Sequence, residues 1–162
     1  MAGSAQEVRP VLRSLNSDEP TYVDFTNTSR HDVRVWWLNF SGRPVSYGVI
    51  KPGGSLKMNT FLTHPWIFTT SEWQWRLLAN TQQVFFPSPA RCEDGSPVYV
   101  KVSVTSPAYS LKEYCYMLIR KKVKRQDFAK LEIPGCLQKE LATTPNLLKE
   151  IEILNLQFRA NF

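Results

Sequence analysis

The spacing of hydrophobic residues in this 162-residue chain changes near Pro107, and this change limits the fold more than any other feature. Before it, apolar residues alternate with others in short runs, most clearly in the valines at every second position from Val98 to Val104. A period of two is typical of β-strands. After it, apolar residues recur at intervals of three and four, which is typical of helices. We therefore expect a β domain over residues 1–106 and an α-helical domain over residues 107–162.

Short alternating or strongly apolar runs predict the strands of the first domain. They cover residues 22–26, 33–40, 45–50, 56–61, 66–70, 76–80, 84–86 and 98–104. Turn-forming Gly and Pro residues separate several of them, within residues 41–44, 51–54 and 93–96. Short strands with frequent turns predict a β-sandwich of about seven to eight strands. Both faces of 33–40 carry large apolar side chains, so one face must pack against something other than water.

A capping box predicts where the first helix begins. Ser110 can cap the helix, and the carboxylate of Glu113, three residues on, can reach back to the N–H of Ser110. Apolar residues then recur on one predicted helix face, namely Leu111, Cys115, Leu118 and Ile119. Pro134 and Gly135 interrupt the stretch that follows.

A further helix is predicted to have Thr144 as its cap and Pro145 at its first position. Its apolar positions are Leu147, Leu148, Ile151 and Leu154. In total we expect a small all-α domain of three to four short helices. About fifty residues of short helices cannot bury all these apolar positions among themselves. Part of that surface should therefore belong to a partner.

The net charge of +6 is concentrated in the segment from Arg120 to Arg125, where five of six residues are cationic. Such a run could be a nuclear address or a nucleic-acid patch. We favour a solvated face at the end of a helix, where cations suit the helix dipole. No aromatic stacking pattern accompanies the charge, so no nucleic-acid partner is expected.

The sequence pattern favours the cytoplasm and nucleus. Residues 1–7 contain no apolar stretch that resembles a signal peptide. Cys92, Cys115 and Cys136 form an odd, widely spaced set with no disulfide framework. No run approaches the ~18 consecutive apolar residues of a membrane span, so no membrane partner is expected.

No catalytic motif is evident, which favours a binding protein over an enzyme. His31 and His64 have no carboxylate or cysteine at metal-ligand spacing, so neither a metal nor a cofactor is expected. Cys115 could act as a nucleophile with His64 as its base, but this needs an exposed thiol with a lowered pKa. Because Cys115 lies on the apolar face of a predicted helix, we favour a packed cysteine.

Several segments, in the same order along the chain, resemble the von Hippel-Lindau family. They are Arg9–Ser17, Val35–Phe40, Gly42–Pro44 with Tyr47, Thr63–Phe68, Val84–Ser88 and Tyr109–Cys115. The resemblance implies an eight-stranded sandwich followed by a small helical domain. It also implies a substrate-recognition subunit of a cullin–elongin B/C ubiquitin ligase, which binds prolyl-hydroxylated hypoxia-inducible factor alpha. The ligase chemistry then belongs to the other subunits, including the RING subunit.

The resemblance implies a docking site for elongin C on the first helix. Its residues are Ser110, Leu111, Cys115, Leu118 and Ile119. An apolar face of this kind can enter a groove on a partner, although the same spacing also suits a helix that packs on its own domain. Ile133, Pro134 and Leu137 resemble a shorter box that selects the cullin.

The resemblance also implies a hydroxyproline pocket in the β domain. Trp37, Tyr47 and Trp66 would form its aromatic walls, and Thr60 and His64 its polar floor. The flanking peptide contacts would be Asn16, Met58, Asn59 and Phe61. Taken singly, these tryptophans and the histidine also suit an ordinary sandwich core.

Several positions depart from the family pattern near that pocket. Thr60 replaces a serine, Asn59 and Phe61 replace a histidine and a tyrosine, and Leu56 replaces an arginine. Gly48 stands where the family has proline, and Trp73 and Trp75 occupy a loop without tryptophan in the family. These changes leave open a diverged adaptor or competitor that binds elongin or hydroxyproline peptides without promoting degradation.

Overall fold

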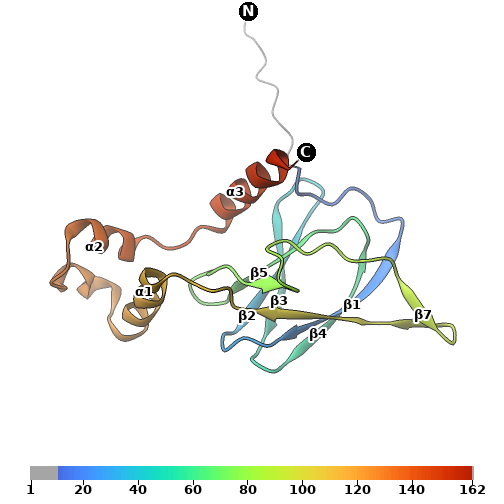
Figure 1. Ribbon diagram of the computed structural model, residues 1–162, viewed down its shortest axis with the longest axis horizontal. Helices are drawn as coiled ribbons and strands as arrows, with labels where there is room; N and C mark the ends of the chain where they lie inside the picture. The colour runs from blue at the N-terminus through green and yellow to red at the C-terminus, as the bar shows by residue number, and fades with distance from the viewer. Residues whose placement is uncertain (1–10, 162) are drawn as a thin grey trace, which may run out of the picture.

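The computed structural model describes residues 11–161, so the predictions that involve residues 1–10 lie outside the described part of the chain. β-strands occupy residues 20–105 and helices follow from residue 111 to residue 160. Figure 1 shows the strands gathered into one body, with α1 and α2 to one side of it. The predicted β-sandwich followed by a helical part is confirmed.

Two sheets form the sandwich. The four-stranded sheet has the order β4–β1–β9–β6, with strands Ser55–Phe61, Pro20–Asn27, Val100–Thr105 and Leu78–Ala79. The three-stranded sheet has the order β3–β2–β5, with strands Pro44–Ile50, Val33–Leu38 and Trp66–Thr70. A separate hairpin consists of β7 (Arg91–Glu93) and β8 (Ser96–Val98). Within residues 11–161, the outer strands β3 and β4 each have one edge that pairs with no other strand.

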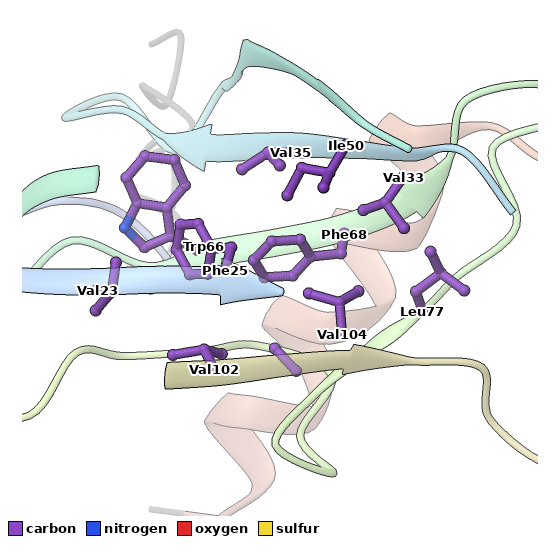
Figure 2. Close-up of a cluster of buried hydrophobic side chains, with 11 residues drawn as sticks. Val23, Phe25, Val33, Val35, Ile50, Trp66, Phe68, Leu77, Val102 and Val104 are labelled. Carbon is purple, nitrogen blue, oxygen red and sulfur yellow. The ribbon is translucent and has the colours of Figure 1, made fainter. Parts of the chain in front are cut away.

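The main core lies between the inward faces of these two sheets. Figure 2 shows side chains from β1, β2, β5 and β9 meeting in this space. The ring of Phe25 is 4.9 Å from that of Phe68 and 5.3 Å from that of Trp66, measured between centroids. The alternation seen in the sequence produces this arrangement, because every second side chain of a strand points to the same face.

Some strands differ from the sequence-based prediction. The segment 76–80 forms only the short β6, because Asn80 and Thr81 have positive φ angles of 46° and 68°. The segment 84–86 forms no strand, and Phe85 makes a single bridge to Trp66. Pro87 follows directly and lacks the N–H that a longer ladder needs. The predicted strand 98–104 is divided at Tyr99, between β8 and β9.

The helical part contains α1 (Leu111–Lys122), the 3₁₀ helix η1 (Arg125–Lys130), α2 (Gly135–Ala142) and α3 (Leu147–Ala160). The capping box is confirmed, since Ser110 Oγ accepts from Glu113 N at 3.1 Å. In return, the Ser110 N–H donates to Glu113 Oε2 at 2.7 Å. No helix in the described range 11–161 is long and apolar enough to cross a membrane.

The start of α3 differs from the prediction. Thr144 and Pro145 precede the helix, and Asn146 is its cap. The Asn146 Oδ1 accepts from the backbone N–H groups of Leu148 at 3.0 Å and Lys149 at 3.4 Å. Asparagine is among the strongest N-caps because its side-chain oxygen can reach the first free N–H groups of a helix.

Helix α3 packs on the outer face of the three-stranded sheet (Figure 1). Its buried Leu147 and Ile151 join Leu38 of β2 and Ile67 of β5 in a second apolar cluster. Trp36, Leu154 and Phe158 pack against the same cluster. This contact accounts for the two apolar faces of β2, since one faces the main core and the other faces α3.

A third cluster joins α1, η1 and α2 through buried Tyr116, Phe128 and Leu141. Arg120 is also buried here, with 7% of its surface exposed. Its guanidinium donates to the backbone carbonyls of Leu141 and Thr143, at 3.0 and 2.9 Å. The expectation of a fully solvated basic run is therefore wrong for this residue, whereas Lys121 and Lys122 are exposed at the end of α1.

The rings of Trp73, Trp75 and Tyr116 surround this guanidinium. Their centroids lie 5.4, 5.2 and 5.6 Å from Arg120 Cζ. Such distances permit cation–π attraction. The two tryptophans therefore connect a loop of the sandwich with α1.

Candidate functional site

A cavity of about 230 Å³ opens between β3, β4 and the turn before β5. All five residues of the predicted pocket line it, namely Trp37, Tyr47, Thr60, His64 and Trp66. The predicted flanking residues Met58, Asn59 and Phe61 line it too. Ser17 and Phe40 also line the cavity, although neither is among the pocket residues that the family resemblance implied. Both lie in segments that resemble the family, and this position in the sequence was the only signal for them.

A β-bulge directs Tyr47 toward the cavity. Arg34 pairs with Val49 and Trp36 with Ser46, so two residues of β3 oppose one of β2. The second of the two is Gly48, whose φ angle of +108° is inaccessible to proline and strained for other side chains. The tyrosine ring then lies edge-on to Trp66, with 5.2 Å between ring centroids.

The wall formed by Trp37 is fixed by two hydrogen bonds in series. Trp37 Nε1 donates to Ser14 Oγ at 2.7 Å, and Ser14 Oγ donates to the carbonyl of Leu38 at 2.7 Å. The indole stacks on the imidazole of His64, with ring centroids 5.1 Å apart and planes at 28°. Because Ser14 is fully buried, these bonds are protected from competing water.

The indole of Trp66, which forms another wall of the cavity, orients the hydroxyl of Thr60. Trp66 Nε1 donates to Thr60 Oγ1 at 3.1 Å, and both side chains are buried. A hydroxyl has one proton and two lone pairs, so the oxygen can accept from the indole while its proton remains free to donate. The floor of the cavity therefore holds a donor.

His64 supplies the complementary acceptor. Its Nε2 lies 3.0 Å from the carbonyl oxygen of Asn16, which can only accept, so Nε2 carries the proton in the neutral ring. Burial lowers the pKa of His64 below its usual 6.5, although the hydrogen bond to Asn16 opposes this in part. Near neutral pH the imidazole is therefore uncharged, and Nδ1 has a free lone pair.

The backbone of Asn16 positions the imidazole of His64. Thr63 Oγ1 donates to the Asn16 carbonyl at 3.0 Å and accepts from the Asn16 N–H at 3.2 Å. The backbone of Asn16 is thus fixed at two atoms beside the ring of His64. In this arrangement Asn16 positions the imidazole, and its predicted contact with a peptide stays a prediction.

The outer edge of β4 lies beside this cavity. The Leu62 N–H donates to the Glu19 carbonyl at 3.0 Å, and the Asn27 N–H donates to the Gly54 carbonyl at 2.9 Å. Both bonds continue the β1–β4 ladder, in which hydrogen-bonded and non-bonded pairs alternate. The even-numbered residues of β4 therefore direct their backbone groups toward β1.

The odd-numbered residues Lys57 and Asn59 consequently direct their N–H and C=O groups away from β1, to the open edge. Their side chains lie on the outer face, whereas Met58 packs toward the core and Thr60 lies in the cavity. An exposed edge of this kind can accept another extended chain as a further strand. The cavity and the edge could thus bind one peptide together.

The surface of α1 forms a second candidate site. Leu111, Tyr114 and Leu118 are 80%, 50% and 54% exposed. Cys115 is exposed among them, so the expectation that it packs within its own chain is wrong. Ser110, the cap residue, is exposed at the beginning of the helix. Apolar side chains this exposed are typical of a contact with another protein.

The remaining predicted docking residues are turned partly inward. Ile119 is only partly buried, and it packs against the third cluster. Ile133 and Leu137 pack against the same cluster, while Pro134 is exposed at the cap of α2. Within residues 11–161, no three His, Cys, Asp or Glu side chains lie close enough together to hold a metal.

Comparison with known proteins covers both the sandwich and the helical part of the chain. The VHL beta domain family model matches residues 12–93, and the VHL box domain model matches residues 109–157. The chain belongs to the von Hippel-Lindau family. It is similar to Protein Vhl of Drosophila melanogaster, with 29% identity over an aligned length of 153 residues; the alignment covers 85% of this chain and 86% of that protein. The family match supports a substrate-recognition module over a catalyst.

The structure accommodates the departures of this chain from the von Hippel-Lindau pattern. Thr60 keeps its hydroxyl in the cavity, and Leu56 packs against the main core. Asn59 accepts a hydrogen bond from Tyr99, at 2.7 Å between Oδ1 and Oη. The replacements therefore alter the rim of the cavity more than its floor.

Proposed function

We propose that this chain is the substrate-recognition subunit of a cullin–elongin B/C ubiquitin ligase and binds peptides that contain hydroxyproline. The observation that carries the proposal is the pairing of a free donor on Thr60 with a free acceptor on His64. Both lie at the floor of an aromatic cavity beside an open strand edge. A hydroxyl group on a flat, apolar ring is the complementary ligand.

The floor can discriminate the hydroxylated ring from proline. The ligand hydroxyl would accept from Thr60 and donate to His64 Nδ1, which satisfies both groups. Unmodified proline would bury both groups without partners, and each unpaired group costs about 1–3 kcal/mol. Sites that recognise a ligand hydroxyl in this way can reject the analogue without it by as much as ~10⁴-fold.

The edge of β4 suits a proline in the peptide. Because the backbone groups of Thr60 point to β1, a residue opposite Thr60 in an antiparallel strand needs no N–H toward β4. Proline has no N–H and is tolerated at such a position. In a parallel strand the same residue would have to donate to β4, so the proposal favours antiparallel addition.

The proposed partners would bind the second surface. We propose that Ser110, Leu111, Cys115, Leu118 and Ile119 belong to the contact with elongin C, which binds elongin B. Ile133, Pro134 and Leu137 would favour a cullin and, through it, the RING subunit. The proposed substrate is hydroxylated hypoxia-inducible factor alpha. A cytoplasmic and nuclear location is part of the proposal, and imaging of the tagged full chain tests it.

Calorimetry on the chain assembled with elongins B and C tests the proposal. Paired peptides with hydroxyproline or proline should differ strongly in affinity for the native protein. Thr60→Val removes the donor at nearly constant volume and should abolish most of this difference. Thr26→Val, on the outer face of β1, is the matched control. Equal binding of the two peptides by the native complex would contradict the proposal.

A second candidate is an adaptor or competitor that binds the peptide without promoting its degradation. The altered rim of the cavity, with Asn59 and Phe61, favours this alternative. The replacement of an arginine by Leu56, which packs against the main core, favours it too. Ubiquitination with the fully reconstituted ligase separates the two. A receptor yields modified peptide, whereas a competitor retains hydroxyproline binding and yields none.

A further inference from the structure

A cationic and aromatic cluster lies on the outer face of the sandwich at the edge of β4. Lys57 is exposed, and its Nζ lies 5.2 Å from the centroid of the Tyr99 ring. The hydroxyl of Tyr99 donates to Asn59 Oδ1 at 2.7 Å. Tyr22 packs edge-on against Tyr99 at 5.6 Å between centroids. The ring beneath the ammonium group is thus held by two neighbours.

The ammonium group of Lys57 forms no ion pair within the described part of the sandwich. Asp24 is its cross-strand neighbour on β1 and lies between Lys57 and Lys101 in register. No carboxylate in the described range 11–161 lies within 4.0 Å of the Lys57 ammonium. The ammonium instead sits over the Tyr99 ring, close to the open edge of its strand.

The register of an added strand places one peptide residue beside this lysine. With hydroxyproline opposite Thr60 in an antiparallel strand, the next residue of the peptide lies opposite Asn59. The second lies opposite Met58 and the third opposite Lys57. Residues directly opposite each other share a face, with Cβ atoms about 4.5–5.5 Å apart. The side chain at the third position therefore meets Lys57 on the outer face.

We propose that Lys57 selects peptides with an acidic side chain at the third position after hydroxyproline. This inference rests on the proposed function and adds a sequence preference to it. The second position provides an internal contrast, because its side chain points to the opposite face of the strand. Lys57 is separate from the cavity and has no part in sensing the hydroxyl.

Calorimetry with four hydroxyproline peptides and the elongin-bound complex tests the inference. The peptides carry Glu or Gln at the third position, or Glu or Gln at the second. The native complex should bind Glu about two- to fivefold more tightly than Gln at the third position, as expected for an exposed cross-strand ion pair. It should not distinguish Glu from Gln at the second position.

Two variants connect the preference to the lysine. Lys57→Met should remove it, and Lys57→Glu should reverse it, so that Gln binds more tightly. Lys101→Met, on β9 and two strands further from the edge, is the matched control and should keep the preference. Raising the salt concentration should weaken the preference, because exposed charges are screened.

The outcomes separate the inference from the function on which it rests. A retained preference for hydroxyproline over proline, with equal binding of Glu and Gln at the third position, overturns the role of Lys57 alone. A Glu preference that persists in Lys57→Met also overturns it. Equal binding of hydroxyproline and proline peptides overturns the proposed function and, with it, the register on which the inference depends.

Discussion

In both Thr60 and His64, one polar function of the side chain binds the protein and another is left for a ligand. One atom of each residue is engaged by the protein, with Thr60 Oγ1 accepting from Trp66 and His64 Nε2 donating to Asn16. The other polar function of each remains available to a ligand. The protein therefore fixes the orientation of both groups before any ligand arrives, which lowers the entropy cost of binding.

The protonation state of His64 should make peptide affinity depend on pH. Its pKa lies below 6.5 because burial disfavours the charged ring. Protonation places a proton on Nδ1 and removes the acceptor, so affinity should fall as pH decreases below 6.5 and stay constant above it. Titration calorimetry across this range checks the prediction. His31→Gln, at the only other histidine, should retain the pH dependence, and His64→Ala should lose it.

The same pKa shift has a consequence for stability. Since the pKa of His64 is lower in the folded than in the unfolded chain, the unfolded state binds more protons between the two values. Folding stability should therefore decrease as pH falls through 6.5 toward the lowered pKa. If acid unfolding, and not protonation of His64, caused the loss of affinity, His64→Ala would behave in the same way. Its melting temperature and its peptide affinity would then still fall together as the pH decreases.

At the scale of single elements, replacement of Gly48 should disturb the bulge in β3. A Cβ atom at this glycine would meet nothing within 4 Å, so any cost of substitution comes from the backbone angle of +108°. Gly48→Ala should destabilise the fold by about 1–2 kcal/mol. It should also weaken peptide binding, because Tyr47 shares the bulge. Urea unfolding measures the first effect and calorimetry the second.

Gly135 at the start of α2 is the matched control for Gly48. A Cβ atom at Gly135 would likewise meet nothing within 4 Å, but the φ angle of this residue is not positive. Gly135→Ala should therefore leave stability unchanged or raise it slightly. A similar loss of stability in both variants would show that the bulge carries no special strain.

The exposed face of α1 should contribute to binding more than to folding. Leu111 is 80% exposed, so Leu111→Ala should change the free energy of unfolding very little. If it anchors elongin C, the same variant should weaken that complex by about 2–4 kcal/mol. Leu148→Ala, on α3 and also largely exposed, is the control. An unchanged affinity for elongin C in Leu111→Ala would remove this residue from the interface.

The sequence predicted local features of the structure better than contacts between residues that are distant along the chain. The capping box at Ser110 depends on residues three apart, and the five cavity residues lie in segments whose order resembles the family. The burial of Arg120 was missed because it depends on Trp73 and Trp75, which are distant in sequence. Periodicity identified the apolar face of α3 but not the sheet that covers it.

At the scale of the whole molecule, the junction between sandwich and helices depends on a few polar and aromatic contacts. Arg76 forms an ion pair with Glu113 of α1, at 2.8 Å between Nη1 and Oε1. The Tyr109 hydroxyl donates to the carbonyl of Arg76 at 2.6 Å. Arg120 connects α1 with the loop that contains Trp73 and Trp75. These contacts hold the proposed substrate site and the α1 surface in one arrangement.

Replacement of Arg120 should loosen this junction. Arg120→Met keeps the length of the side chain but leaves the carbonyls of Leu141 and Thr143 without their donor. We expect a loss of about 2–4 kcal/mol, from unsatisfied buried acceptors and lost cation–π contacts. Urea unfolding measures it, with exposed Lys121→Met as the control. Equal stability of the two variants would contradict a structural role for Arg120.

Helix α3, the last helix of the chain, covers an apolar surface of the sandwich. A premature stop codon after residue 146 would spare every cavity residue and the whole of α1. It would nevertheless uncover Trp36, Leu38 and Ile67, and it would remove the Asn155 side chain that accepts from the Leu12 N–H at 2.8 Å. Such a shortened protein would be lost to precipitation and quality control, even though its recognition chemistry was intact.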